Sequence, residues 1–184
     1  SILPSTDASG TGKEFCEIKK VRKLTFTGST EVGRVLLGQA AKNVLKCSME
    51  LGGNAPFIVF DDADLDDAVQ GAIMCKFRNN GQTCVCANRI YVQTGVYNEF
   101  AAKLQKAVSK LKVGDGFDPE TTLGPLIGLN AVKKVNSHIE DAISKGAEPI
   151  YCNTYSEEDG NFIYPTILTG VTKKMKVATE ETFG

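Results

Sequence analysis

The chain has 184 residues, 42% hydrophobic and 23% charged, with a formal net charge of −1. This balance is typical of a globular protein with a substantial core, and the near-zero charge argues against nucleic acid or an acidic membrane as a partner. No apolar run approaches the roughly 18 residues of a transmembrane helix, and six cysteines without a framework spacing predict reduced thiols in a cytosol-like compartment.

Strand and helix patterns alternate along the chain. Short runs of apolar and β-branched residues predict strands, and apolar residues three or four positions apart predict helices. In chain order, the predicted elements are a strand at 21–27, a helix at 31–45, a strand at 55–60, a helix at 65–77, a strand at 89–93, helices at 97–111 and 131–145, and strands at 149–152 and 164–168 around a polar loop at 153–161. This order predicts an α/β fold with a mostly parallel sheet and flanking helices.

Caps and buried faces follow from the same patterns. Ser29 or Thr30 is placed to cap the first helix. Asp61 or Asp62 is placed to cap the second, and the continuous apolar run at 55–60 predicts a strand covered on both faces. The inward stripe of the second helix is predicted to comprise Val69, Ala72, Ile73 and Phe77.

The last predicted helix carries the only histidine of the chain, His138. The amphipathic pattern of this helix is interpreted as placing His138 at the surface. Gly146 follows the helix and is expected to end it in a left-handed conformation.

The segment FTGSTEVG, residues 26–33, predicts a strand, a tight turn and a helix start. Such a turn presents backbone N–H groups and the positive end of a helix dipole, which suit a phosphate. Gly28 would let a ligand approach the backbone closely, whereas Glu31 would repel a phosphate if it pointed inward. The pattern is not G-x-G-x-x-G, so a capped helix after a tight turn is the alternative interpretation.

The segment MELGGNAP, residues 49–56, places Glu50 just before a pair of glycines. Two adjacent glycines allow unusual backbone angles, and loops at strand ends are where α/β proteins keep their sites. Glu50 is therefore a candidate catalytic carboxylate, and the alternative is a solvated surface glutamate.

The segment NNGQTCVC, residues 79–86, carries Cys84 and Cys86 in a C-x-C arrangement. No second Cys/His pair lies nearby in the sequence, so we expect no metal site. A Cys–His dyad would need His138 as its base, which is a weak hypothesis. A cysteine nucleophile without a histidine must be activated by helix-end amides, a nearby cation or a carboxylate base, because at a pKa of about 8.5 only a small fraction is thiolate at neutral pH.

Together these motifs resemble the aldehyde dehydrogenase superfamily. GSTEVG, ELGG and GQTC occur in this order, EETFG at 180–184 fits as well, and the likeness covers essentially the whole chain. The stretches KFRNNGQTCVCANRIYVQ and VGDGFDPETTLGPLI are most similar to the succinate-semialdehyde dehydrogenases of that superfamily. The resemblance implies that 1–53 is the last part of a Rossmann-like NAD(P)-binding domain and that 54–184 is a C-terminally truncated catalytic domain.

The resemblance also implies site residues. The positions implied to bind the cofactor are Gly28, Ser29, Thr30, Glu31, Val32, Gly33, Leu51, Glu181 and Phe183. Cys84 is implied as the nucleophile and Glu50 as the general base. Thiolate attack on the aldehyde would form a thiohemiacetal, hydride loss to NADP or NAD would give a thioester, and water deprotonated by Glu50 would hydrolyse it. Likeness to the bacterial-type enzymes favours NADP.

Two neighbours of Cys84 also take implied roles. Arg78 matches the residue that binds the substrate carboxylate in the semialdehyde enzymes, which a guanidinium can do bidentately; the alternative is a cation that closes a helix C-terminus. Cys86 matches a second cysteine that forms a reversible disulfide with the nucleophile in some relatives, and a small, partly buried thiol is the alternative.

The implied activity is the NAD(P)-dependent oxidation of succinic semialdehyde to succinate. The expected partner is a small-molecule aldehyde, with no nucleic acid and no membrane, and the full-length protein is expected to be a homodimer or homotetramer. It would be cytoplasmic, or mitochondrial in an animal. We expect the 184 residues alone to be inactive, because half of the dinucleotide cleft would be missing. The alternatives are a dehydrogenase for another aldehyde and a non-catalytic redox-sensing protein that uses Cys84 and Cys86.

Overall fold

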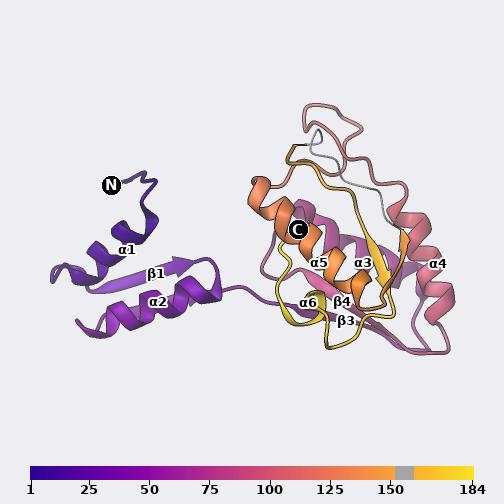
Figure 1. Cartoon of the computed structure of the whole chain (residues 1–184), viewed down its shortest axis with the longest axis horizontal. Coiled ribbons are helices and arrows are strands. Elements are labelled where there is room, and N and C mark those ends of the chain that lie inside the picture. Colours follow the sequence, from indigo (N-terminus) through magenta and orange to yellow (C-terminus); the bar gives the residue numbers. More distant parts are fainter. Residues whose placement is uncertain (152–159) are drawn as a thin grey trace. The chain divides into compact units, whose positions relative to one another are not determined.

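The computed structural model describes residues 1–151 and 160–184. These residues form two compact units, Ser1–Gly52 and Gly53–Gly184 (Figure 1). Each unit has a hydrophobic core of its own. Most of the predicted polar loop at 153–161, and Cys152, lie outside the described residues. Within those residues, no helix combines the length and the apolar character needed to cross a membrane.

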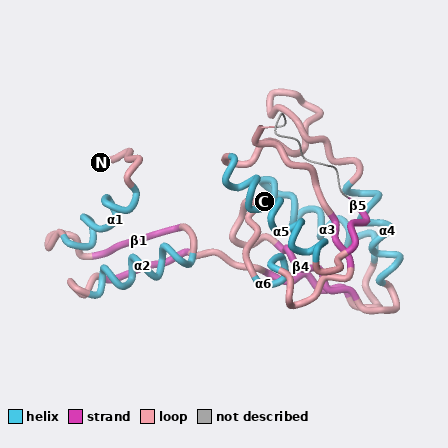
Figure 2. Tube along the Cα trace, in the orientation of Figure 1, coloured by secondary structure: helices cyan, strands magenta, loops and turns pink. Residues whose placement is uncertain are grey.

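The first unit is a two-stranded parallel sheet with two helices (Figure 2). Its elements are α1 (Ala8–Glu17), β1 (Lys23–Thr27), α2 (Thr30–Ala41) and β2 (Lys46–Glu50). Side chains of the strands alternate between exposed and half-buried positions. The half-buried face packs against a core formed by Cys16, Leu36 and Ala40. The opposite face is polar and exposed, as is typical of a sheet with only one covered face.

The first unit differs from prediction in three places. Neither α1 nor β2 was predicted from the sequence. The glycine- and serine-containing α1 has weak intrinsic propensity, but Asp7 caps it by accepting a hydrogen bond from Gly10 N at 2.8 Å, and burial of Cys16 stabilises it. The helix predicted at 31–45 ends at Ala41.

The second unit contains two strand pairs and the remaining helices. Its elements are β3 (Ala55–Val59), α3 (Leu65–Phe77), the 3-10 helix η1 (Arg78–Gly81), β4 (Ala87–Val92), α4 (Tyr97–Val108), α5 (Leu129–Ser144), β5 (Glu148–Tyr151), β6 (Ile167–Thr169) and α6 (Lys176–Thr179). Strands β3 and β4 are parallel, and β5 and β6 are antiparallel. The α/β class is confirmed. The antiparallel β5–β6 pair is an exception to the mostly parallel sheet that was predicted. The polar loop predicted between these strands has no helical pattern for a parallel crossover.

The main core of the second unit lies where α3 and α4 pack against β3 and β4. Its buried residues are Val59, Val69, Ala72, Phe100, Leu104 and Val108. The predicted inward stripe of α3 is confirmed, since Ile73 and Phe77 pack against the same cluster. The cap of α3 is Asp64 rather than Asp61 or Asp62, because its carboxylate accepts from the N–H groups of the first helical turn.

The prediction that the strand at 55–60 is covered on both faces is wrong for β3 in the described residues. Ile58 and Phe60 are more than half exposed, whereas Val59 is buried. This alternation arises because the helices of the main core cover one face of the β3–β4 pair within the described residues. A continuous apolar run therefore did not distinguish a strand with two covered faces from a strand with one.

Truncating the main core should destabilise the protein strongly. Phe100 is 2% exposed, so Phe100→Ala should lower the free energy of unfolding by about 3–5 kcal/mol through lost burial and the cavity left behind. Phe117 is 98% exposed, and Phe117→Ala should change it by less than about 0.5 kcal/mol. Urea unfolding of the full-length protein measures both, and equal effects would contradict this description of the core.

Candidate active site

In the first unit, the residues predicted to bind a cofactor and to act as a base lie at one edge of the sheet. Strands β1 and β2 are parallel, and Thr27 pairs with Glu50 at their carboxyl ends. The next N–H, of Gly28, donates to the Glu50 carbonyl at 3.0 Å. The turn at 28–33 and Glu50 therefore emerge side by side, at the edge where open α/β sheets bind ligands.

The start of α2 has the features of an anion site. Ser29 is its cap, and its hydroxyl accepts from Val32 N at 3.3 Å. The N–H groups of a first helical turn have no acceptor within the helix, which suits a dinucleotide phosphate. A Cβ at Gly33 would lie 2.6 Å from Leu51 Cδ2, so Leu51 packs directly against this turn. Glu31 also lies in the first turn, and its charge would oppose an anion placed beside it.

In the second unit, Cys84 lies on an exposed turn between η1 and β4. Cys86 N donates to the Thr83 carbonyl at 3.2 Å and closes the turn, so Cys84 occupies its second position. The Cys84 side chain is exposed. No acceptor within the described residues bonds to the Cys84 backbone N–H. This N–H could therefore donate a hydrogen bond to an oxyanion formed when a substrate is attached to the Cys84 sulfur.

The backbone before this turn is held by side-chain bonds. Asn79, Asn80 and Gly81 have positive φ values of 52°, 55° and 75°. The Asn80 amide donates to the Gly124 carbonyl at 2.8 Å and accepts from Gly124 N at 3.1 Å. The Gln82 side chain accepts from Ile127 N at 2.9 Å. These bonds compensate for an unusual conformation that only surrounding structure can maintain.

Arg78 is the C-cap residue of α3 and is exposed. Within the described residues, no acceptor forms a hydrogen bond or ion pair with its guanidinium. Its position is compatible with both predicted roles, since a cation at a helix C-terminus is favoured and an unoccupied guanidinium can bind a carboxylate.

The segment at 180–184 lies against the Cys84 turn. Glu181 Oε1 accepts from Gly53 N at 3.1 Å. A Cβ at Gly53 would lie 3.0 Å from the Cys84 carbonyl oxygen. Gly53 therefore contacts both Glu181 and the Cys84 turn. It was not among the site residues expected from the sequence. Phe183, which is partly exposed with φ 57°, follows in the same segment.

Comparison with known proteins identifies the family of the chain. Residues 2–184 match the model of the aldehyde dehydrogenase family. The chain belongs to the aldehyde dehydrogenase family.

Individual relatives within the family cover nearly all of the chain. It is 60% identical to the Escherichia coli succinate-semialdehyde dehydrogenase [NADP(+)] GabD, over 96% of this chain and 37% of that protein. It is 62% identical to a Pseudomonas putida glutarate-semialdehyde dehydrogenase, over 96% and 36%. The crystal structure of a succinate-semialdehyde dehydrogenase from Burkholderia pseudomallei superposes with a TM-score of 0.94 at 57% identity, over 100% and 38%. The chain thus spans well under half the length of these relatives.

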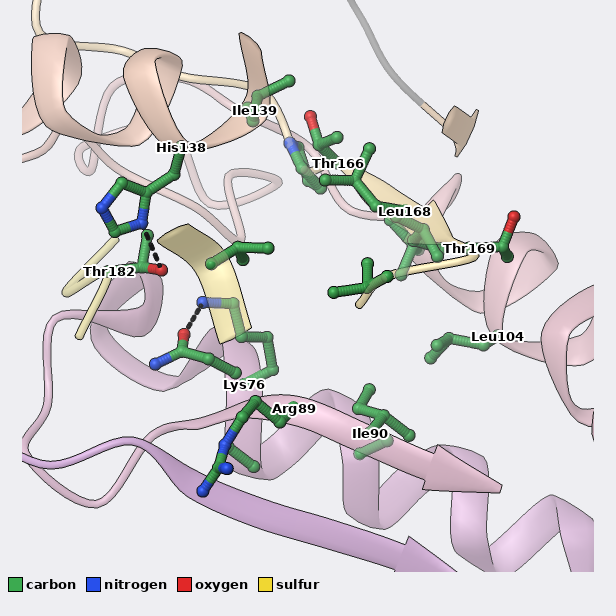
Figure 3. A pocket seen from close by; sticks show the side chains of 18 of the residues that line it. Lys76, Arg89, Ile90, Leu104, His138, Ile139, Thr166, Leu168, Thr169 and Thr182 are labelled. Atoms are coloured by element: carbon green, nitrogen blue, oxygen red, sulfur yellow. Dashed lines mark hydrogen bonds between the residues drawn. The ribbon is translucent and has the colours of Figure 1, made fainter. Parts of the chain in front are cut away.

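His138 of this aldehyde dehydrogenase chain is buried, not at the surface as predicted. It is 2% exposed and belongs to the inward stripe of α5 with Val132, Val135 and Ala142, a spacing that could have revealed its burial. Its Nδ1 lies 3.2 Å from Thr182 Oγ1 (Figure 3). Its Nε2 lies 3.4 Å from Glu180 Oε2. His138 therefore binds the same segment that carries Glu181.

Cys86 differs from Cys84 in its surroundings. Cys86 is 1% exposed, and both thiols are free. Burial raises the pKa of the Cys86 thiol, and the nearby Lys76 ammonium opposes the shift. Lys76 was not singled out from the sequence, although this residue falls on the inward stripe of α3 one turn after Ala72.

A largely apolar cavity of about 870 Å³ also lies in the second unit (Figure 3). Side chains from β4, α4, α5 and β6 line it, including Ile90, Leu104, Ile139 and Leu168. Neither Cys84 nor Arg78 lines it, so the cavity is separate from the predicted nucleophile. Among the described residues, no group of three or more His, Cys, Asp or Glu side chains could hold a metal ion.

The contacts of His138 predict a pH dependence of stability. Burial lowers the pKa of His138 below its ordinary value of 6.5; Glu180 opposes this shift, while Lys134 and Lys176 add to it. As the pH falls through 6.5, the unfolded chain binds a proton more readily than the folded chain. The stability that the neutral ring provides above this pH should therefore decline below it.

The measurement is the free energy of unfolding of the full-length protein at about pH 7.5 and about pH 5.5, compared with that of a His138→Gln variant. The variant can still bond to Thr182 but cannot titrate, so its stability should fall less on acidification. An equal fall in both proteins would contradict the prediction.

Proposed function

We propose that this chain is part of a dehydrogenase that uses NADP or NAD to oxidise succinic semialdehyde to succinate. The observation that carries the proposal is an exposed Cys84 on a braced turn beside Glu181, with an unpaired Arg78 shortly before it in the chain. Membership of the aldehyde dehydrogenase family supports the reaction type. Two relatives, a succinate-semialdehyde dehydrogenase and a glutarate-semialdehyde dehydrogenase, support the substrate class.

The proposed chemistry begins at Cys84. Its thiolate attacks the aldehyde carbon, a C–S bond forms, and the negative charge moves to the former carbonyl oxygen, where the Cys84 N–H can donate. When bound, the oxidised nicotinamide supplies the acceptor for the hydride of the aldehyde carbon. Glu50 acts as the general base that takes a proton from the water that releases the acid from Cys84.

The proposed cofactor contacts are those that the resemblance to the family implies. The turn formed by Gly28, Ser29, Thr30, Glu31, Val32 and Gly33, together with Leu51, is proposed to bind the dinucleotide. Glu181 and Phe183 are proposed to hold its nicotinamide end. NADP is favoured over NAD because the Escherichia coli relative is named for NADP(+).

Arg78 is proposed to bind the acid group at the far end of the substrate. A guanidinium binds a carboxylate with two parallel hydrogen bonds, which fixes direction as well as distance. Glutaric semialdehyde is a second candidate, because the Pseudomonas putida relative named for it is 62% identical. Both substrates end in a carboxylate, so Arg78 would serve either.

We also propose that the full-length enzyme is a cytoplasmic homodimer or homotetramer, mitochondrial if the source is an animal, and that the 184 residues alone are inactive. Cys84 and Cys86 form a reversible disulfide when a two-electron oxidant such as a peroxide takes up the two electrons and two protons of the thiols, and this bond stops turnover. A closure over one intervening residue is strained and so readily reduced. A purely redox-sensing protein is less well supported, since a sensor has no use for Glu50.

Removing the nucleophile tests the reaction type. In the full-length protein, Cys84→Ala should lower kcat on succinic semialdehyde by at least about 1,000-fold, because no other group would form the covalent adduct. Cys75→Ala replaces another exposed free thiol and should leave kcat unchanged. Steady-state kinetics with each cofactor measure both variants, and substantial turnover by Cys84→Ala would exclude the proposed mechanism.

Removing the guanidinium tests the substrate class. Arg78→Ala should raise KM for succinic semialdehyde by about 10- to 100-fold, the worth of hydrogen bonds to a charged group, and should change KM for butanal little. Arg22 is another exposed arginine, and Arg22→Ala should affect neither. If Arg78→Ala changed KM equally for the two aldehydes, Arg78 would act only as a helix cap and the proposed carboxylate contact would be wrong.

A further inference from the structure

Lys76 is a partly buried cation with no Asp or Glu side chain paired to it among the described residues. Its Nζ lies 2.7 Å from Asn88 Oδ1, 2.6 Å from the Gly184 carbonyl oxygen and 3.6 Å from Cys86 Sγ. Figure 3 labels Lys76. An ammonium group has three N–H donors, so these three contacts account for all of them. Lysine is seldom withdrawn from water unless specific acceptors compensate for its lost hydration.

This position carries an electrostatic cost, because burial removes water from the ammonium group. Burial lowers the pKa of Lys76, and the Cys86 thiol opposes the shift. An uncharged residue of similar length would fit the inward stripe of α3 without this cost. What the ammonium provides, and apolar packing does not, is a set of hydrogen bonds to its three acceptors.

The acceptors belong to two segments of the site. Cys86 closes the turn on which Cys84 lies, and Asn88 follows it in β4. Gly184 ends the segment that carries Glu181 and Phe183. One cationic group thus bonds simultaneously to the nucleophile turn and to the segment proposed to hold the nicotinamide.

Gly81 shows how closely these groups approach one another. A Cβ at Gly81 would lie 2.7 Å from the Gly184 carbonyl oxygen and 3.1 Å from Lys76 Nζ. Its φ of 75° is also one that side-chain-bearing residues rarely adopt. The left-handed backbone before Cys84 therefore passes directly over the bond between Lys76 and Gly184.

We propose that Lys76 is a positioning residue for Cys84, which fixes the nucleophile turn against the segment at 180–184 through Cys86, Asn88 and Gly184. The inference rests on the proposed function, because it assigns Lys76 to the same reaction. Without the ammonium, Asn88 Oδ1 and the Gly184 carbonyl lose a charged donor, and Cys86 no longer has a fixed partner. Displacement of a reacting atom by about 1 Å can cost about 100-fold in rate.

The test compares Lys76→Met with Lys106→Met in the full-length protein. Lys106 lies in the last turn of α4, as Lys76 does in α3, but is exposed. Turnover is expressed per Cys84 thiol that remains titratable, so that loss of folded protein does not count as loss of rate. We expect Lys76→Met to lower kcat by about 10- to 100-fold, with KM for the aldehyde changed less than about 3-fold because Arg78 is intact. Lys106→Met should match wild type, and an unchanged kcat per intact site in Lys76→Met would overturn the proposal.

A second measurement reports on the turn without any turnover. The rate at which iodoacetamide alkylates Cys84, followed by mass spectrometry, should change at least about 5-fold in Lys76→Met and not in Lys106→Met. A double-mutant cycle with Cys86→Ala should be non-additive, because both substitutions break the same bond. Strict additivity would overturn the proposal. If Lys76→Met fails to fold, Asn88→Ala removes the same contact from the other side and must give the same loss of kcat.

The two measurements separate this inference from the proposed function. A wild-type protein that oxidises succinic semialdehyde, with a Lys76→Met variant of equal kcat, would overturn the role of Lys76 alone. A wild-type protein that oxidises no semialdehyde would overturn the proposed function. Altered alkylation of Cys84 in Lys76→Met would then still support its positioning by Lys76.

Discussion

Three consecutive residues with left-handed backbone, Asn79 to Gly81, precede the turn that carries Cys84, and the site of the second unit depends on keeping them in that conformation. Asparagine and glycine tolerate positive φ better than other residues, yet a run of three needs support from outside. Asn80 provides it by bonding to both backbone groups of Gly124. The direction of the chain entering β4, and hence the position of Cys84, follows from this bracing.

The segment at 180–184 is held to the second unit by polar side chains. Glu181 bonds to Gly53, His138 to Thr182, and Lys76 to Gly184. A segment without regular structure has no backbone ladder of its own, so side chains from α3 and α5 and the backbone N–H of Gly53 bond to it instead. These contacts explain why the inward stripes of two helices each include one ionisable residue where an apolar one would pack as well.

In the first unit, strand pairing alone places the predicted site residues. Parallel pairing of β1 with β2 brings the turn at 28–33 and Glu50 to the same edge, because both strands end there. The glycine at 33 then makes room for Leu51. Regular secondary structure thus positions the residues of the first unit, whereas irregular backbone and buried polar bonds position those of the second.

The sequence by itself determined the α/β class, most strands and helices, and the motifs around Glu50 and Cys84, because periodicity, turn residues and short motifs are local properties of the chain. It did not reveal α1, whose weak propensity is offset by burial of Cys16. It misplaced His138, and it overlooked Lys76 and Gly53. Only the tertiary structure decided these, because a polar residue on an inward stripe can be interpreted only when its partners, here residues 44 and 108 positions away in the chain, are known.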